Sequence, residues 1–170
     1  AGTPAAVFDA AWTLLLANPL YTALLGERPD WPGHGRNGVW WTFLGPPGRV
    51  LLSPAERRAL EEALVGDLRT TAQRHPRDPR LRELVAELRT RSARFADLWD
   101  GGAVGRHEAA RKTVDHPRVG TLTLDCDVLT VEGAGLRVML YTAEPGTPDA
   151  RRLAQLGESV VPELVATAAG

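Results

Sequence analysis

The stretch HPRVGTLTLD, residues 116–125, ends one strand and begins another, and it decides the fold. Pro117 biases His116 toward extended geometry, and Gly120 supplies the turn between the strands. Beyond it, apolar and polar residues alternate, as in a half-exposed strand. Leu122, Leu124, Cys126 and Val128 form one set, and Thr121, Thr123, Asp125 and Asp127 form the other. His116 lacks any accompanying nucleophile or metal motif, so we interpret it as structural.

Two neighbouring stretches extend this sheet. The segment before His116 predicts an antiparallel partner, and LRVMLYTA, residues 136–143, is apolar on both faces apart from Arg137. Such a strand is typical of a central position covered on both sides. Helices cover only one face, so we expect N-terminal residues or, preferably, a second copy of the chain to shield the other, giving a homodimer. The alternation slips near residues 125–128, which predicts a bulge.

The N-terminal region predicts two strands and two short helices. Residues 7–8 and 12–16 have strand character, and a helix begins at about Asn18 and ends at Gly26. After a loop rich in glycine and proline, VWWTFLG, residues 39–45, is interpreted as a short helix.

Two long helices follow. SPAE, residues 53–56, combines a capping box with a proline in the first turn, and the helix is expected to end near His75. Asp78 caps a second helix whose apolar face continues to Trp99, and Gly101 ends it. The short connection predicts an antiparallel helical hairpin.

This order of elements predicts a single α+β domain over residues 1–170 with a PAS-like plan. An antiparallel twisted sheet has helices, including the long hairpin, packed over one face. Ligands in this plan bind between the sheet and the helices.

Composition excludes several classes of protein. The chain has 44% hydrophobic and 24% charged residues, and no apolar run approaches the roughly 20 residues of a membrane span. We see no signal peptide and expect a cytoplasmic protein. The arginines alternate with acidic residues, so we expect this chain not to bind nucleic acid by itself.

Catalytic, metal and cofactor motifs are missing from the sequence. The single cysteine excludes an intrachain disulfide and a multi-cysteine metal site. GHGRNG, residues 33–38, matches the dinucleotide pattern G-x-G-x-x-G, but no hydrophobic strand precedes it. We therefore predict no catalytic residue, metal or cofactor, and a protein that is not an enzyme.

Aromatic and arginine residues indicate a slot for a small apolar ligand with an acidic end. The candidate residues are Trp40, Phe43 and Leu44 on the short helix, Leu68, Leu88, Phe95 and Trp99 on the hairpin, Leu122 and Tyr141 on the sheet, and Arg36, Asn37 and Arg49. Arg49 is the preferred anchor for a carboxylate and Arg36 the second choice, with Asn37 or Tyr141 as neutral donors. The alternative is that Arg49 caps a turn after GPPG.

Several segments together resemble one known family. They are NPLYTALLG, GRNGVWWTFLGPPGRVLL, HPRDPRLRELVAELRTRSARFADLW, RKTVDHPRVGTLTLD and LYTAEPGT. In this order they resemble the ligand-binding domain of MmyB-like transcription regulators. The resemblance implies a PAS-like sensory domain for a fatty-acid-like molecule, found in actinobacterial regulators linked to antibiotic metabolism. In that family it follows a helix-turn-helix domain of the Cro/repressor type.

The sequence departs from the family at two places and leaves alternatives open. It contains no helix-turn-helix segment, so we expect any contact with DNA to be made by a domain absent from this chain. LSPAE stands where the family has an acidic residue followed by tryptophan. A PAS-like dimerisation module with a filled core is the main alternative function, and a small enzyme acting on a lipid is the third.

Overall fold

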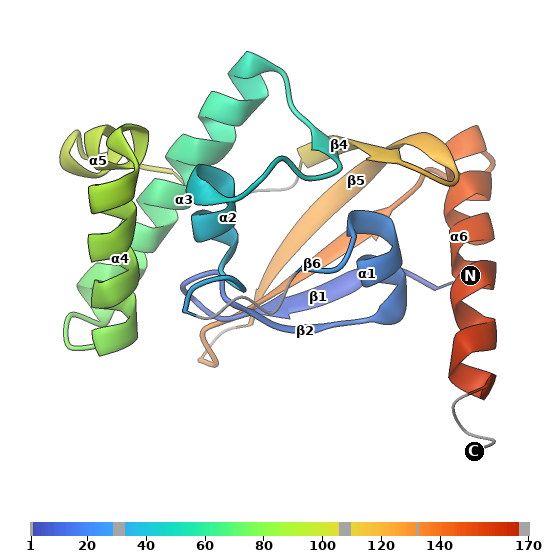
Figure 1. Cartoon of the computed structure of the whole chain (residues 1–170), viewed down its shortest axis with the longest axis horizontal. Coiled ribbons are helices and arrows are strands. Elements are labelled where there is room, and N and C mark those ends of the chain that lie inside the picture. Colours follow the sequence, from blue (N-terminus) through green and yellow to red (C-terminus); the bar gives the residue numbers. More distant parts are fainter. Residues whose placement is uncertain (1, 29–32, 106–109, 132, 167–170) are drawn as a thin grey trace.

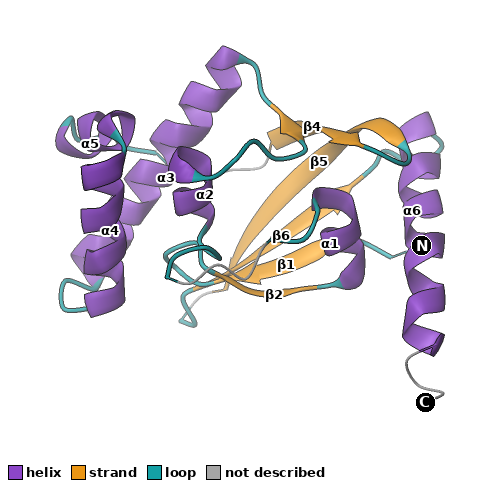
Figure 2. Cartoon of the chain, viewed as in Figure 1, coloured by secondary structure: helices purple, strands orange, loops and turns teal. Residues whose placement is uncertain are grey.

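The computed structural model describes residues 2–28, 33–105, 110–131 and 133–166, with side chains to residue 160. The chain forms an antiparallel six-stranded sheet that curls into a half-barrel, with helices at both of its ends (Figures 1 and 2). The expected α+β, PAS-like class is confirmed. No helix within the described ranges is long and apolar enough to cross a membrane.

The strand order of the sheet is β2-β1-β6-β5-β4-β3. The strands are β1 (Ala5–Phe8), β2 (Leu14–Ala17), β3 (Val50–Leu51), β4 (Ala110–His116), β5 (Gly120–Val131) and β6 (Leu136–Thr142). The last three confirm the antiparallel set expected around His116, and β6 is central as its apolar composition predicts. The short strand β3, which sequence analysis did not predict, pairs with β4 at the edge.

The helices begin where capping residues predict. They are α1 (Pro19–Leu25), α2 (Gly38–Leu44), α3 (Pro54–Arg74), α4 (Pro79–Arg91), α5 (Ala93–Asp100) and α6 (Pro148–Ala166). The side chain of Ser53 accepts from the Glu56 N–H, and the Glu56 carboxylate accepts from the Ser53 N–H, which forms the expected capping box.

The prediction of one helix from Asp78 to Trp99 is wrong, because the helix breaks at Ser92. Ser92 has extended backbone geometry, with φ −128° and ψ 105°, and its side chain accepts from the Phe95 N–H. Its own N–H donates to Leu88. Ser92 is therefore both the C-cap of α4 and the N-cap of α5. Its hydroxyl accepts the hydrogen bond of a backbone N–H that the preceding turn would accept in an unbroken helix.

Two details of the strands also differ from expectation. The second strand begins at Leu14, because Asp9 accepts from the N–H groups of Ala11 and Thr13 and holds residues 9–13 in a turn. The bulge expected near residues 125–128 is absent from the ladder between β5 and β6, which runs without a shift from Asp125 to Val131. The register shifts instead in β1, between Val7 and Phe8.

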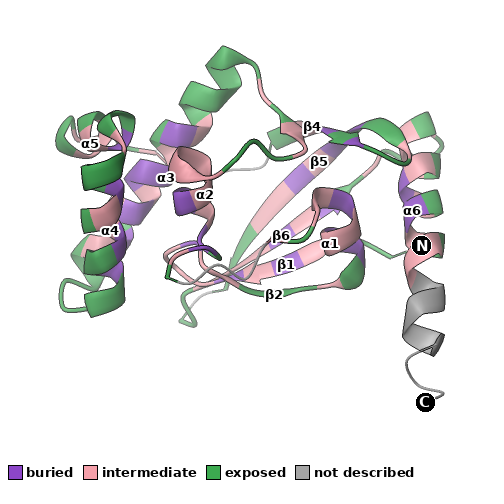
Figure 3. Cartoon of the chain, viewed as in Figure 1, coloured by how far each residue is buried: buried purple, intermediate pink, exposed green. Residues whose placement is uncertain are grey.

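The sheet has two unlike faces. The inner face carries the buried side chains of Phe8, Leu122, Leu124, Cys126 and Tyr141 and contacts α1. The outer face carries the alternate residues. Helices α2–α5 gather at one end of the sheet and α6 lies at the other, beside α1 (Figures 1 and 3). The buried residues of α4 lie on its side facing α3 (Figure 3), so the hairpin has an apolar core of its own.

Candidate ligand-binding site

His116 is a structural residue, as its sequence context predicts. Its side chain is buried, and its Nε2 lies 2.9 Å from the carbonyl oxygen of Ala23, at the end of α1. Its Nδ1 accepts from the N–H groups of Arg118 and Val119. Because Nδ1 is an acceptor, the proton sits on Nε2 and is donated to Ala23. The histidine thus joins the turn between β4 and β5 to α1.

Arg49 also bonds to the C-terminal end of α1. Its Nη1 donates to the carbonyl oxygens of Ala23 and Leu24, at 2.8 and 3.2 Å, and its guanidinium lies against Gly26. A cation at the last carbonyls of a helix interacts favourably with the helix dipole. The alternative from sequence, in which Arg49 caps the turn after GPPG, is wrong, because these bonds go to the end of α1. Binding of a carboxylate by Arg49 remains an untested prediction.

Arg36 and Asn37 connect the loop before α2 to the sheet. The Asn37 side chain accepts from the N–H groups of Val39 and Trp40, and its Nδ2 donates to Ala11. Arg36 Nε donates to the carbonyl of Leu14. Asn37 is therefore the N-cap of α2, and both side chains bond to backbone groups.

The apolar candidates fall into two groups. Phe43 packs edge-on against Phe95, with ring centroids 5.2 Å apart, and Phe95 stacks on Trp99 at 5.6 Å. Leu68 of α3 and Leu88 of α4 are fully buried in the neighbouring helices, with Trp40 buried and Leu44 half-buried on α2. Leu122 and Tyr141 lie on the inner face of the sheet, where Tyr141 contacts Tyr21 of α1.

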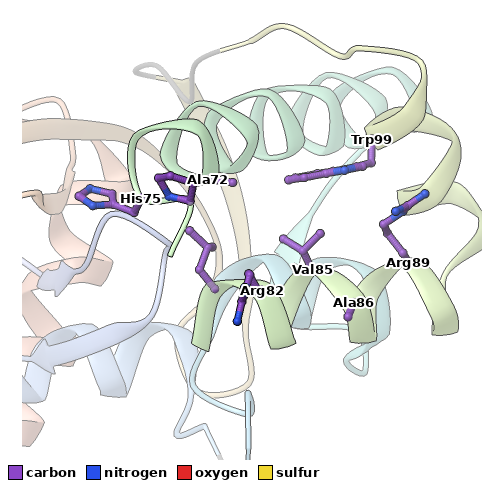
Figure 4. A pocket seen from close by; sticks show the side chains of 9 residues that line it. Ala72, His75, Arg82, Val85, Ala86, Arg89 and Trp99 are labelled. Atoms are coloured by element: carbon purple, nitrogen blue, oxygen red, sulfur yellow. The ribbon is translucent and has the colours of Figure 1, made fainter. Parts of the chain in front are cut away.

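A shallow hollow of about 260 Å³ lies on the outside of the hairpin, between α3 and α4 (Figure 4). Of the candidate residues, only Trp99 lines it. The other lining residues are Ala72, His75, Pro76, Leu81, Arg82, Val85, Ala86 and Arg89. This hollow is open to solvent and does not lie between the sheet and the helices.

Polar side chains also gather on the inner face of the sheet, where α1 covers it. Tyr21 comes from α1, and Lys112, Cys126 and Tyr141 come from β4, β5 and β6. Their register places all three strand residues on the same face, because Lys112 pairs with Leu124 and Cys126 pairs with Tyr141. The rings of Tyr21 and Tyr141 have their centroids 6.1 Å apart.

Burial keeps the acidic members of this group neutral. It raises the pKa of Tyr21 to about 12, and the positive charge of Arg28 opposes this shift in part. Burial likewise raises the pKa of Tyr141 and of the Cys126 thiol. The hydroxyls and the thiol are therefore hydrogen-bond donors at neutral pH.

One cationic member, Arg28, is incompletely satisfied. Its guanidinium lies over the Trp41 ring, 5.6 Å from the ring centroid, and its charge opposes the raised pKa of Tyr21 and Tyr141. Its Nη1 is buried and has no hydrogen-bond partner among the residues that the structure describes. Burial lowers the pKa of Arg28, and it also lowers the pKa of Lys112. A buried N–H of a charged group without an acceptor is costly, so this position favours an anion.

Sequence reasoning found only Tyr141 in this cluster. Lys112 is the one lysine of the chain, and its even spacing from Val114 already indicates the inner face. For Arg28 no such signal exists, because it lies in an irregular segment whose path the strand pattern does not determine.

Comparison with known proteins agrees with the fold and with a site for a small molecule. The family model described as MmyB-like transcription regulator ligand binding domain matches residues 1–156. A search of curated proteins found no match. Since the family model covers most of the chain, the protein belongs to the family of MmyB-like transcription regulator ligand-binding domains.

Proposed function

We propose that this domain senses an apolar small molecule with an acidic head group, such as a long-chain fatty acid, in a cytoplasmic transcription regulator. Membership of the ligand-binding family supports a sensory role. The single observation that carries the choice of ligand is the buried Arg28 Nη1, which lacks an acceptor within the described residues. A carboxylate would supply that acceptor and balance the charge.

The surroundings of Arg28 support a carboxylate. Burial raises the pKa of Tyr21 and Tyr141 although the Arg28 charge opposes it, so both hydroxyls stay protonated and can donate to a carboxylate. Lys112 supplies a second cation on the same face of the sheet. A head group here would accept from neutral and charged donors together. We therefore assign the anchor first to Arg28, with Arg49 as the alternative from sequence.

The apolar end of the ligand would have to contact hydrophobic side chains of the protein that are not already fully buried. Phe43 and Leu44 of α2, Val50 of β3 and Leu60 of α3 are half-buried side chains that pack against the core. They come from elements beside the inner face, so they are the side chains that we expect an alkyl chain to contact. Burial of such a chain contributes roughly 0.8 kcal/mol per methylene group.

Signalling would follow from a population shift. A ligand changes the balance between two arrangements only if it binds one more tightly than the other. Arg28 lies over the Trp41 ring of α2, so an anion bound to Arg28 would act beside α2. The output would be a changed position of a partnered helix-turn-helix domain, through which alone the regulator would contact DNA.

Calorimetry with hexadecanoate and its methyl ester tests the anchor. We expect the acid to bind more tightly than the ester, and Arg28→Met to weaken the acid by roughly 2 to 5 kcal/mol while sparing the ester. Arg49→Met is the matched control, because it removes the other candidate cation. Equal binding of acid and ester by the wild-type chain, or an unchanged affinity in Arg28→Met, would contradict the assignment. A loss in Arg49→Met alone would move the anchor to Arg49.

A dimerisation module with a filled core is the second candidate, and one observation favours it. The hollow of about 260 Å³ lies at the hairpin surface, as does a second hollow lined by Arg69, Ala72, Gln73, Trp99 and Asp100. In the core, Leu68, Leu88, Phe95 and Leu122 are fully buried. Native mass spectrometry of the purified chain separates the two functions, since a sensor retains or acquires the fatty acid and a filled module does not.

A further inference from the structure

The hairpin of α3, α4 and α5 carries a surface groove that the proposed ligand site does not use. Two adjoining hollows form this groove, because Ala72 of α3 and Trp99 of α5 line both of them. Pro76 and Val85 add apolar surface to the larger apolar part of the groove (Figure 4). Ala72, Val85 and Trp99 are half-buried, so part of each side chain stays open to solvent. We call the two hollows together the hairpin groove.

Neighbouring side chains hold Trp99 in place within the groove. Its ring stacks on the fully buried ring of Phe95, with centroids 5.6 Å apart. The Arg69 guanidinium lies over the Trp99 ring, 5.7 Å from its centroid, and also donates to the Trp99 carbonyl oxygen. The apolar surface is therefore formed before any partner binds, which lowers the entropy cost of binding.

The end of the groove next to the connection between α3 and α4 is cationic. The arginines there are Arg74, Arg77, Arg80 and Arg82. All four are exposed, and none of their side chains has an ion pair or a hydrogen bond within the part of the chain that the structure describes. Asp78, between them, accepts from two backbone N–H groups as the N-cap of α4. Glu83 follows on α4, so the four arginines exceed the two carboxylates by two charges.

The charges at the other end of the groove are balanced. Arg89 and Asp100 form an ion pair at 2.9 Å. Arg69 and the exposed Asp97 are the remaining charges there, and they have opposite signs. The excess of positive charge therefore lies at the connection between α3 and α4, while the apolar surface lies between the two ends.

This combination favours an acidic segment of a protein over other anions. A nucleic acid duplex would supply phosphates for the arginines, but it has few apolar groups that could fill the groove. A neutral apolar partner would fill the groove and leave the arginines without acceptors. A peptide that carries both carboxylates and a large apolar side chain would meet both requirements, since arginine pairs well with carboxylates.

We propose that the hairpin groove docks a short acidic segment of another protein. A large apolar side chain of that segment lies against Trp99 and Val85, and its carboxylates face the arginines of the connection between α3 and α4. The groove is on the outside of the hairpin, and Arg28 does not line it. The inference is therefore independent of the ligand and of its anchor.

Fluorescence anisotropy with a labelled peptide tests the proposal. The peptide alternates pairs of aspartates with phenylalanine and leucine, and its control has serine in place of both apolar residues. We expect the wild-type chain to bind the apolar peptide at least roughly 10-fold more tightly than the serine peptide, because only the former buries hydrocarbon in the groove.

Two substitutions with matched controls locate the binding surface. Arg82→Glu reverses a charge at the cationic end, and Ala86→Glu places a carboxylate in the groove, which Ala86 lines. Each should raise the dissociation constant of the apolar peptide roughly 10-fold. Arg58→Glu and Ala59→Glu make the same changes at exposed positions of α3, roughly 20 Å from Ala72 along the helix, and should leave binding unchanged.

Three outcomes would overturn the proposal. One is equal binding of the apolar peptide and the serine peptide by the wild-type chain. Another is an equal loss in each variant and its matched control, provided that circular dichroism shows all four variants folded as the wild type. The third is a DNA duplex that binds more tightly than the peptide and loses affinity in Arg82→Glu, because the arginines would then form a nucleic-acid contact.

Discussion

Asp67 on α3 is the residue whose replacement we expect to destabilise the domain most clearly. Its Oδ1 accepts from Arg137 Nη2 and its Oδ2 from Trp12 Nε1, both at 2.8 Å. The Arg137 guanidinium lies 4.6 Å from the Trp12 ring centroid, and its Nη1 donates to the Ala10 carbonyl. Asp67 and Arg137 are 15% and 12% exposed, so this ion pair is largely withdrawn from water.

The expected magnitude follows from these bonds. Hydrogen bonds to a charged group contribute about 1.5 to 3 kcal/mol each, and removing one partner of a buried pair costs about 3 to 5 kcal/mol. Arg137 keeps its bond to Ala10 and its position over Trp12, which moderates the loss. We therefore expect Asp67→Ala to lower the free energy of unfolding by about 3 kcal/mol, equivalent to a fall in Tm of roughly 6 to 12 °C.

Urea unfolding followed by tryptophan fluorescence measures this change, and an exposed ion pair provides the control. Arg89 and Asp100 lie 2.9 Å apart with side chains 47% and 60% exposed. Removing that pair by Asp100→Ala should cost less than about 1 kcal/mol. The double variant Asp67→Ala/Arg137→Met should lose less than the sum of its single variants, because the two residues interact. An Asp67→Ala variant as stable as Asp100→Ala, or strictly additive single effects, would refute the reasoning.

Two helical glycines should respond in opposite directions to alanine. In α3, a Cβ at Gly66 would clash with the backbone nitrogen of Gly105, so Gly66→Ala should destabilise by about 1 to 3 kcal/mol. In α6, a Cβ at Gly157 meets only a side-chain carbon at 3.9 Å, so Gly157→Ala should stabilise by up to about 1 kcal/mol. Urea unfolding measures both, and equal signs would contradict the packing argument. Tyr21 and Tyr141, the two tyrosines of the chain, should not ionise near pH 10 in the folded protein, since burial raises the pKa of Tyr21 to about 12 and that of Tyr141 above its usual value. The stability that their neutral forms contribute is present below pH 10 and is lost as pH rises through these values. Ultraviolet absorbance of the phenolate measures this, and ionisation at pH 10 before unfolding would disprove the burial.

Local sequence signals predicted most elements of the fold because each depends on neighbouring residues. The capping box at Ser53, the proline and glycine around His116 and the two-residue alternation after Gly120 act over a few residues. The break at Ser92 was missed because the apolar face of the hairpin continues across it, and periodicity alone does not register a serine that caps in both directions.

Contacts between distant residues limited the prediction of the site. Sequence analysis noted Arg137 as the one charge in an apolar strand, but its partner Asp67 lies 70 residues away. Sequence analysis preferred Arg49 as the anchor and did not single out Arg28. Only the structure distinguishes them, because Arg49 donates to carbonyls of α1, whereas Arg28 Nη1 has no acceptor among the described residues.

The join between the hairpin and the sheet is held by largely buried polar side chains. Within the hairpin, Phe95 stacks on Trp99 and leucines are buried, and Arg94 of α5 also pairs with Glu61 of α3. At the join, Asp67 bonds to Trp12 and Arg137, and Thr71 donates to the Ala10 carbonyl. Directional hydrogen bonds hold one arrangement and break together, and a close-packed apolar interior likewise resists gradual sliding. Under the function proposed above, a bound anion that preferred a second position of the hairpin would shift the population toward it.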